Sequence, residues 1–347
     1  MYRANVHSSA QWTFNILRPT PKGTLMKPLY FLVAGIIGLC APPLSMNAFA
    51  QPTSTQAPGY YRVQLGSYTV TALSDGTLPI PFAKLLHNGA QAEIDQAYRS
   101  AGIDDHRETS INAFLIDTGS KRILVDAGAG DLFGACCGHL PEMLAAAGYE
   151  GNSIDAILLT HVHGDHSGGI THDGKRVFPN ATLYLAKAEL DYWMSDEAKA
   201  KAKASHQDMF VKGRAALAPY LAAGRVQTFT QGAEIFPGIH TVAAPGHTPG
   251  HTLYEVTNAG HTILFIGDMI HVAEVQLPMP AITVDYDDNE AEAAKTRIET
   301  LAMLARTHEL VAAPHISFPG LGHIYKQANG YAWAPVPYAA HVVQVGQ

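Results

Sequence analysis

The amino-acid sequence predicts an α/β fold in which two β-sheets lie between layers of helices in one domain. Three observations lead to this prediction. Segments that alternate like strands recur between segments with helical spacing, in the order strands, helix, strand, helices, strands, helix, strand. The composition, 47% hydrophobic and 15% charged over 347 residues, supplies material for a sizeable core. Residues that bind metals follow several of the predicted strands.

The first 50 residues are excluded from the fold because they resemble an extension followed by a cleaved secretory signal peptide. Met26, the expected true start, begins a basic stretch, residues 29–40 are apolar, and Ala48-Phe49-Ala50 supplies a cleavage site. A membrane anchor is the alternative, although the apolar run is short for a spanning helix. We therefore expect an exported protein, periplasmic or secreted, with a single domain over residues 51–347, since no linker divides that part.

The first predicted elements are two hairpins, a helix and a strand. Residues 61–65 and 68–73 alternate around a Gly-Ser turn, and residues 111–116 and 122–126 alternate around a second turn. Residues 140–147 have helical spacing, and the apolar run 155–160 predicts a short buried strand.

The remaining elements complete the α/β order. The patterns predict, in chain order, a strand at 181–185, an Ala-rich helical region at 188–221, a strand at 241–244, a hairpin at 252–256 and 261–266, a helix at 290–306 and a strand at 310–313.

The charge of the predicted mature chain argues against a nucleic-acid-binding protein. Residues 1–50 contain four of the 23 basic residues and no acid, which leaves 19 basic and 30 acidic residues and a formal charge of −11. Nucleic-acid binding depends on a basic surface that neutralises phosphates. A small-molecule substrate is the expected partner instead.

The run His161-Val-His-Gly-Asp-His166 predicts a metal site. Its ligand residues are His161, His163, Asp165 and His166. Neutral imidazoles and a carboxylate suit Zn²⁺ or a similar divalent ion. The run directly follows the predicted strand 155–160, and a strand end holds such a loop firmly.

Three more candidate ligands follow predicted strands. They are His247 in the loop Pro245-Gly-His-Thr-Pro-Gly-His251, Asp268 after an apolar strand, and His315 after the last strand. Seven ligands exceed what one tetrahedral ion needs and suit two ions. The expected cofactors are two divalent metal ions, Zn²⁺ first, with Mn, Co or Fe as alternatives because the same ligands accept them.

These residues, in this order, resemble the metallo-β-lactamase superfamily. The resemblance implies an αββα sandwich with a binuclear site at one edge and Asp126 as an early structural aspartate. It implies His161, His163 and His247 on one ion, Asp165, His166 and His315 on the other, and Asp268 between the two.

A narrower resemblance points to methyl parathion hydrolases and related lactonases, which are exported enzymes. It rests on Ala57-Pro-Gly-Tyr-Tyr-Arg62, Ala72-Leu-Ser-Asp-Gly-Thr77, Gly246-His-Thr-Pro-Gly-His-Thr252 and the stretch from His315 to His323. It implies a substrate pocket lined by Phe133, Trp193 and Phe210, each of which also suits a plain core role, and a homodimer as a possible assembly. This chain departs from the pattern at His271, where an apolar pocket residue is expected, and at Cys136-Cys137 beside the pocket.

The expected mechanism is hydrolysis by hydroxide. Two neighbouring cations lower the pKa of the water between them, so that hydroxide can attack a carbonyl or phosphoryl centre. Asp165 and Asp268 are the predicted catalytic carboxylates, and Phe133, Trp193, Phe210 and His271 are the predicted substrate-binding residues.

The expected activity is therefore hydrolysis of lactones or aryl esters and of organophosphate triesters. The alternatives are another hydrolase of this fold, a β-lactamase or a thioesterase, and a non-catalytic metal-binding protein. The sequence does not set the order of these substrates, because pocket loops decide it.

Overall fold

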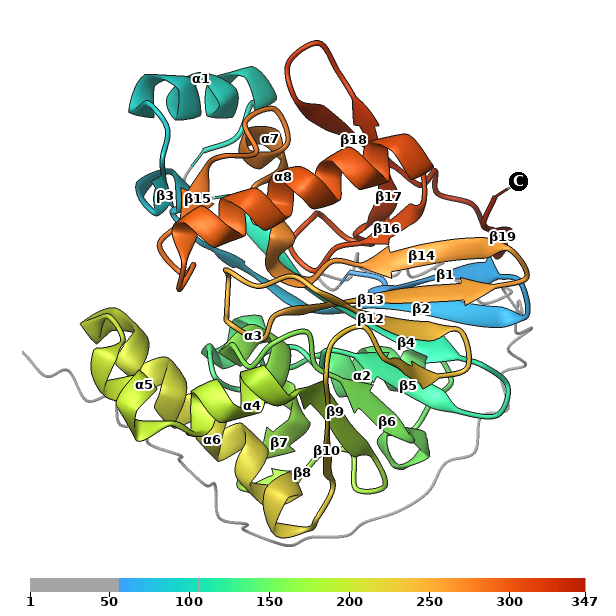
Figure 1. The fold of residues 1–347 in the computed structure, drawn as a ribbon. Helices are drawn as coiled ribbons and strands as arrows, with labels where there is room; N and C mark the ends of the chain where they lie inside the picture. Colours follow the sequence, from blue (N-terminus) through green and yellow to red (C-terminus); the bar gives the residue numbers. More distant parts are fainter. Residues whose placement is uncertain (1–55, 105–106, 347) are drawn as a thin grey trace, which may run out of the picture. The chain divides into compact units, whose positions relative to one another are not determined.

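The computed structural model describes residues 56–104 and 107–346 (Figure 1). The predicted signal peptide, with its cleavage site after Ala50, lies outside the described residues. Within the described part, no helix combines the length and the apolarity that crossing a membrane requires.

Two sheets, each with parallel and antiparallel strands, form the centre of the described part of the chain. The first sheet has the order β10-β9-β6-β5-β4-β2-β1-β19, and the second has the order β11-β12-β13-β14-β16-β17-β18. The strands of the first sheet are β1 (Tyr60–Leu65), β2 (Tyr68–Pro79), β4 (Glu108–Asp117), β5 (Arg122–Val125), β6 (Ala156–Leu158), β9 (Thr182–Ala186), β10 (Val226–Phe229) and β19 (Val343–Gln344). Those of the second are β11 (Glu234–Phe236), β12 (Ile239–Ala243), β13 (Thr252–Asn258), β14 (His261–Phe265), β16 (Leu310–Ala312), β17 (Leu321–Lys326) and β18 (Tyr331–Pro335).

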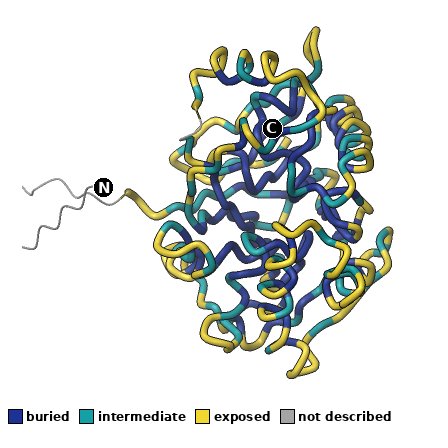
Figure 2. Tube along the Cα trace, turned by 90° about the vertical axis from the view of Figure 1, so that its left-hand side faces the viewer, coloured by how far each residue is buried: buried dark blue, intermediate teal, exposed yellow. Residues whose placement is uncertain are grey.

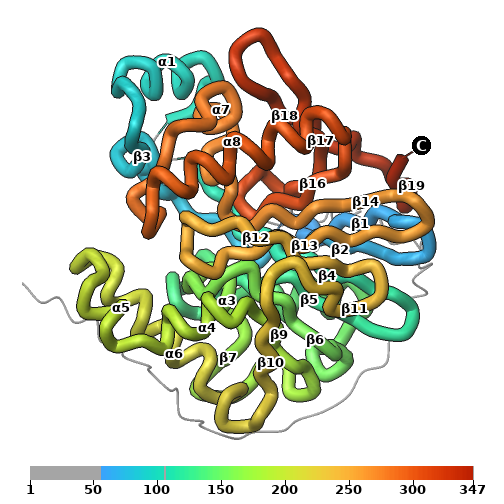
Figure 3. Tube along the Cα trace, in the orientation of Figure 1, coloured from blue at the N-terminus to red at the C-terminus, as the bar shows by residue number. Residues whose placement is uncertain are grey.

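Helices cover the outer face of each sheet. On the side of the second sheet lie α1 (Gln91–Ala101), α7 (Ala273–Gln276) and α8 (Glu290–Thr307), and on the side of the first lie α2 (Leu140–Ala146), α3 (Gly164–Ser167), α4 (Lys187–Met194), α5 (Asp196–Lys201) and α6 (Gln207–Ala222) (Figures 1 and 3). Two small sheets add β3 (Leu86–His87) with β15 (Thr283–Val284), and β7 (Thr171–His172) with β8 (Lys175–Arg176). This is the predicted αββα sandwich.

Short 3-10 turns connect several of these elements. They are η1 (Phe82–Lys84), η2 (Gly134–Cys136), η3 (Gly151–Ser153), η4 (Gly168–Ile170), η5 (Ala204–His206) and η6 (Gly267–Met269).

The apolar core has three layers, which the alternation of the strands produces. Between the two sheets, residues such as Phe114 and Phe265 pack at a ring distance of 5.4 Å. A second cluster joins the first sheet to α2, α4 and α6, and a third joins the second sheet to α7 and α8. Figure 2 shows this buried interior as a continuous dark centre with exposed residues at the periphery. Successive side chains of a strand point to opposite faces, so one strand can supply two layers.

The predicted hairpins are confirmed, and so is the helical region at residues 188–221. That region forms several helices, α4, α5, η5 and α6, as the predicted order of elements has it. The chain leaves the helical conformation at Ser195, whose φ of −81° and ψ of 120° are extended. The Ser195 hydroxyl accepts a hydrogen bond of 3.1 Å from Ala198 N and thereby caps α5. The break places the start of α6 beside the metal-ligand loops.

Candidate metal centre and substrate cavity

The first ligand loop is held in place by Asp126 at the end of β5. Asp126 has a φ of 57°, and its carboxylate accepts hydrogen bonds from Thr160 N at 2.8 Å and Thr160 Oγ1 at 2.9 Å. It also lies 2.8 Å from His166 Nδ1. Thr160 is the last residue before His161, so one carboxylate fixes both the start of the loop and the orientation of a histidine inside it. This agrees with the structural role that the resemblance implies for Asp126.

The structure brings four predicted ligands together in a first set. His161, His163, His247 and Asp268 each offer an atom, and these atoms all lie within 4.8 Å of one another. His163 Nδ1 is 2.9 Å from His247 Nε2, and His247 Nε2 is 3.2 Å from Asp268 Oδ2. All four side chains are buried.

A second set lies directly beside the first. It contains Asp165, His166, His315 and Asp268, again with ligand atoms within 4.8 Å of one another. Asp268 Oδ1 is 2.9 Å from His166 Nε2 and 3.2 Å from His315 Nε2, and Asp165 Oδ2 is 3.4 Å from His315 Nε2. Asp268 therefore belongs to both sets, one oxygen facing each. The seven predicted ligands form one cluster with the grouping that the resemblance implies.

Buried polar atoms without hydrogen-bond partners show that these residues fit a metal. His161 Nε2, His166 Nε2 and Asp268 Oδ1 are buried, and none of them makes a hydrogen bond of normal geometry within the described protein, although the last two atoms lie 2.9 Å apart. Leaving such groups unsatisfied costs about 1–3 kcal/mol each. One divalent cation in each set would satisfy all three, because imidazole nitrogens and carboxylate oxygens are ligands that Zn²⁺ binds well.

The protonation of the histidines follows from their surroundings. Burial lowers the pKa of His161 and His163 well below the usual histidine value, so both stay neutral. Burial opposes charge on His247 as well, but the carboxylates of Asp268 and Asp287 raise its pKa to about 10. Although burial opposes ionisation of Asp268, the surrounding histidines, His166 first, hold the pKa of Asp268 well below its usual value. The cluster therefore concentrates an ionised carboxylate among imidazoles.

A ring of outer groups orients the ligands. Asp287 Oδ1 lies 2.8 Å from His247 Nδ1, and the Ser110 carbonyl oxygen lies 2.9 Å from His315 Nδ1. His251 Nε2 accepts a hydrogen bond of 3.0 Å from Asp268 N. Such partners fix the tautomer and the ring direction of a metal-binding histidine. Asp287 was not among the residues predicted from the sequence, because its only signal is an acidic run directly after the short strand β15.

Glu189, to which no sequence pattern pointed, joins the two ligand loops. Its fully buried carboxylate accepts hydrogen bonds from Val162 N at 2.9 Å and Trp193 Nε1 at 2.6 Å through one oxygen. The other oxygen accepts from Thr248 Oγ1 at 2.7 Å and Gly250 N at 3.0 Å. Val162 lies between two ligands and Thr248 follows a third, so Glu189 of α4 fixes their relative position.

A cavity of about 260 Å³ opens onto the metal cluster. His163, Asp165, His247, Asp268 and His315 form its polar floor. Its sides are lined by Leu78, Ile80, Phe82, Phe133, Met209 and Tyr286, with Ser205, Asp208, Lys212 and His271 among them. An apolar wall over a cluster of charged and polar groups suits a small molecule with an apolar part and one reactive polar centre.

Two of the four predicted substrate-binding residues line this cavity. Phe133 is 42% exposed at its edge. His271 is buried, with Nε2 3.1 Å from Asp268 Oδ2 and its ring stacked on His315 at 5.4 Å. His271 therefore contacts the carboxylate that the two ligand sets share and limits the space beside it.

The prediction that Trp193 and Phe210 line the pocket is corrected by the structure. Both are 1% exposed and belong to the core between the first sheet and its helices. Their rings lie 4.6 Å apart, and the Trp193 ring packs edge-on against His163 at 5.4 Å. Trp193 thus supports the predicted metal ligand His163 from within the core. Met209, the neighbour of Phe210 on α6, lines the cavity instead, because successive residues on a helix point in different directions.

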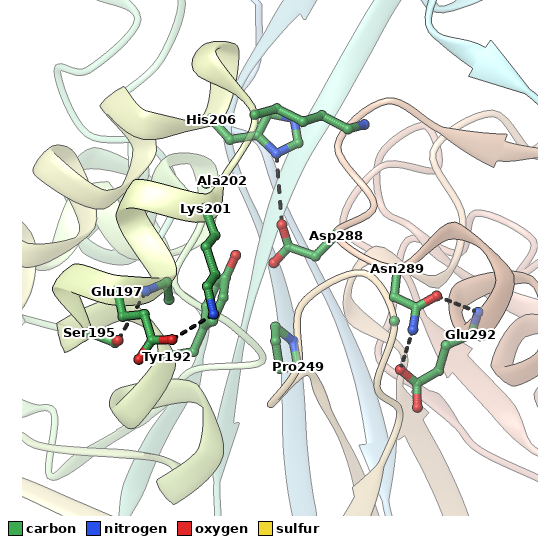
Figure 4. A pocket seen from close by; sticks show the side chains of 13 residues that line it. Tyr192, Ser195, Glu197, Lys201, Ala202, His206, Pro249, Asp288, Asn289 and Glu292 are labelled. Atoms are coloured by element: carbon green, nitrogen blue, oxygen red, sulfur yellow. Dashed lines mark hydrogen bonds and ion pairs between the residues drawn. The ribbon is translucent and has the colours of Figure 1, made fainter.

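A second, larger cavity of about 520 Å³ lies beside the loop that follows His247 (Figure 4). It is lined by residues of α4, α5, η5 and the start of α8, among them Tyr192, Lys201, His206, Asp288 and Asn289. His206 Nδ1 lies 3.8 Å from Asp288 Oδ1, and Lys201 pairs with Glu197 at 2.6 Å (Figure 4). Neither set of metal-binding groups found among the described residues opens into it. The smaller cavity is therefore the candidate site of chemistry.

Comparison with known proteins agrees with this geometry. The sequence profile described as "Metallo-beta-lactamase superfamily" matches residues 106–315. AbOPH, a hydrolase in the beta lactamase superfamily with a known crystal structure, shares 37% sequence identity with this chain. The two structures align with a TM-score of 0.78 over 82% of this chain and 100% of AbOPH. AidC, a dizinc quorum-quenching lactonase solved with a product N-hexanoyl-L-homoserine, is 26% identical, with a TM-score of 0.74 over 81% of this chain and 98% of that chain.

Curated relatives match over shorter segments. An atrochrysone carboxyl ACP thioesterase of Passalora fulva is 27% identical over 160 residues, which are 46% of this chain and 38% of that protein. An N-acyl homoserine lactonase of a Bacillus species is 27% identical over 130 residues, which are 37% of this chain and 44% of that protein. The chain thus spans less than half the length of these two relatives.

Proposed function

This chain belongs to the metallo-beta-lactamase superfamily, and from that premise we propose that it is a binuclear metal-dependent hydrolase that opens lactones and cleaves aryl esters, with a lesser activity on organophosphate triesters. The observation that carries this proposal is the shared Asp268, which joins two ligand sets on the floor of a cavity with an apolar wall. A metal-storage protein would need the ligands but not the adjoining cavity.

The residues of the two sets would hold one divalent ion each, with Zn²⁺ as the proposed metal and Mn, Co or Fe as alternatives. Bound there, the ions would supply a hydroxide nucleophile at neutral pH and stabilise the negative charge that develops on the substrate oxygen. No other nucleophile is then required of the protein.

The chain's own groups have distinct roles in this proposal. Asp268 holds the two ligand sets at a fixed separation, and Asp165, 21% exposed at the edge of the second set, faces the cavity. His271, 3.1 Å from Asp268, is positioned to donate a hydrogen bond to the substrate or to hold the carboxylate in place. Phe133 and the other apolar side chains exclude water and hold the acyl or aryl part of the substrate.

Lactones are the preferred substrate class. The dizinc lactonase AidC aligns with this chain over 98% of its own length, and an N-acyl homoserine lactonase is among the curated relatives. The methyl parathion hydrolase motifs of the sequence support phosphotriesters as the second class, because hydroxide attack with an oxygen leaving group serves both. The thioesterase relative makes an acyl thioester the third candidate.

The test is a side-by-side measurement of kcat/KM on the zinc-loaded chain. The substrates are an N-acyl homoserine lactone, an aryl lactone, a methyl phosphotriester and an acyl thioester, and metal content is measured on the same sample. We expect the lactones to exceed the others by orders of magnitude. A leading phosphotriester or thioester would reverse the substrate order. Two bound ions with no hydrolysis of any substrate would contradict the enzyme proposal.

Export remains a separate proposal that rests on the sequence pattern of residues 26–50. Expression of the full chain followed by cell fractionation and N-terminal sequencing tests it. We expect the exported form to begin at Gln51, and a cytoplasmic product that retains residues 1–50 would contradict export.

A further inference from the structure

Two adjacent free cysteines lie next to the substrate cavity. Cys136 ends the turn η2, and Cys137 follows it, with the two Sγ atoms 2.6 Å apart. Cys136 is partly exposed, whereas Cys137 is only 6% exposed. One thiol is therefore within reach of a small molecule in solution, and its neighbour is buried directly beside it.

The cysteine pair packs behind the apolar wall of the cavity. Cys137 belongs to a small buried cluster with Ile111 and Ala129, against which Cys136 and Leu78 pack. Cys136 Sγ also lies 3.5 Å from the carbonyl oxygen of Phe133. Leu78 and Phe133 both line the cavity, so the pair contacts two elements of its wall.

Strand β2 lies directly against the backbone of the cysteine pair. A Cβ on Gly76 would lie only 2.1 Å from the Cys136 carbonyl oxygen, so β2 presses directly on the Cys136–Cys137 peptide. Gly138 N donates a hydrogen bond of 3.1 Å to the buried carboxylate of Asp75. Movement of the pair toward Gly76 of β2 is therefore blocked, whereas Cys136 Sγ already contacts Phe133 of the cavity wall.

We propose that Cys136 and Cys137 form a redox-modification site whose ligand class is small organic disulfides, and that its oxidation alters the cavity wall. In the first step the Cys136 thiolate attacks a disulfide RSSR, which breaks the S–S bond and releases one RSH with a mixed disulfide on Cys136. In the second step Cys137 attacks Cys136 Sγ and releases the second RSH. The two cysteines lose two protons and two electrons, and RSSR gains them.

The order of the two steps follows from burial. Burial, together with the neighbouring Cys136, raises the pKa of the Cys137 thiol well above its usual value, so Cys137 is a poor first nucleophile. The partly exposed Cys136 attacks first, and Cys137 resolves the adduct from the adjacent position.

The closed form is expected to be readily reduced again. Consecutive Cα atoms lie about 3.8 Å apart across a trans peptide, which is below the span of about 4.4–6.8 Å that disulfides favour. A disulfide between adjacent residues is therefore strained, and strained disulfides have more oxidising potentials and exchange easily. The pair fits a reversible modification rather than a permanent crosslink.

Intact-mass analysis tests the modification without reference to hydrolytic activity. All proteins carry Cys40→Ser, so that Cys136 and Cys137 are the only cysteines, and are reduced and then treated with oxidised glutathione. We expect the Cys136–Cys137 chain to lose two hydrogen masses and to regain them with a reductant. Cys137→Ser should retain one glutathione adduct, and Cys136→Ser should remain unmodified. An unreacted Cys136–Cys137 chain, or equal adducts on the two single variants, would overturn the proposal.

The effect on the cavity is measured on the same samples. We expect oxidation to raise KM severalfold for a substrate with an apolar chain and to leave metal content unchanged, with no redox effect in the variant with both Cys136→Ser and Cys137→Ser. Identical KM in the reduced and oxidised forms would refute the link to the cavity wall. If the chain hydrolyses none of the test substrates, displacement of a bound apolar fluorophore from the cavity replaces KM. A chain that hydrolyses none of the test substrates can therefore still reveal whether oxidation alters the cavity, so failure of the proposed function and failure of the redox proposal give different results.

Discussion

The replacement Glu189→Gln tests whether one buried carboxylate holds the two metal-ligand loops together. Glu189 accepts hydrogen bonds from Val162 N and Trp193 Nε1 through one oxygen and from Thr248 Oγ1 and Gly250 N through the other. Glutamine has nearly the same shape, but its NH₂ group cannot accept a hydrogen bond. One pair of donors must therefore lose its acceptor.

The structure determines which orientation of the glutamine costs least. If the glutamine NH₂ faces Thr248, the Thr248 hydroxyl can rotate and accept a hydrogen bond from it. Only Gly250 N is then left without an acceptor, which costs about 1–3 kcal/mol. The hydrogen bonds from Val162 N and Trp193 Nε1 then go to a neutral carbonyl oxygen and are roughly half as strong as those to the carboxylate. Burial raises the pKa of Glu189, so removing the charge returns part of this loss. We expect a net destabilisation of about 2 kcal/mol, or a fall in Tm of roughly 4 °C.

Urea denaturation of the metal-free chain measures this change, because bound metal would add its own concentration-dependent stabilisation. Zinc affinity is measured in parallel and should fall about 10–100-fold, as for other losses of groups that orient metal ligands. The matched control is Glu197→Gln, whose 77%-exposed side chain pairs with Lys201, and it should change stability by less than about 0.5 kcal/mol. If Glu189→Gln is as stable as the control and binds zinc normally, the Glu189 carboxylate does not hold the two metal-ligand loops together.

Three further predictions concern the metal cluster. Asp268→Asn should lose at least one ion and most hydrolysis, as measured by metal analysis and kcat/KM, and two ions with full activity would exclude the bridging role. Asp126→Asn should weaken zinc binding about 10–100-fold in a chelator competition, because the amide orients His166 poorly; unchanged affinity would contradict this. The folded pKa of His247, about 10 against 6.5, means that its contribution to the stability of the metal-free chain is complete below pH 6.5 and is lost as pH rises through about 10. Denaturation across that pH window should show the loss of stability in the unaltered chain and a smaller loss in Asp287→Asn. Equal losses in the two proteins would contradict this prediction.

The elements that the sequence predicted well are those with local signals. The hairpins around residues 66–67 and 259–260 formed because strand alternation and turn residues are encoded within a few positions. The region 188–221 was predicted to contain helices, but the position of the break at Ser195 was not predicted, since Ala-rich spacing continues through the break and only the cap geometry marks it.

The sequence by itself determined the metal cluster, whereas the tertiary structure decided what surrounds it. His161, His247 and His315 could be recognised because each follows a strand, and strand ends of one edge meet wherever the sandwich forms. The directions of Trp193 and Met209 could not, because the side of a helix that faces the cavity depends on how α4 and α6 pack on the first sheet. Glu189 likewise acquires its partners only when loops 27 and 61 residues away in sequence come together around it.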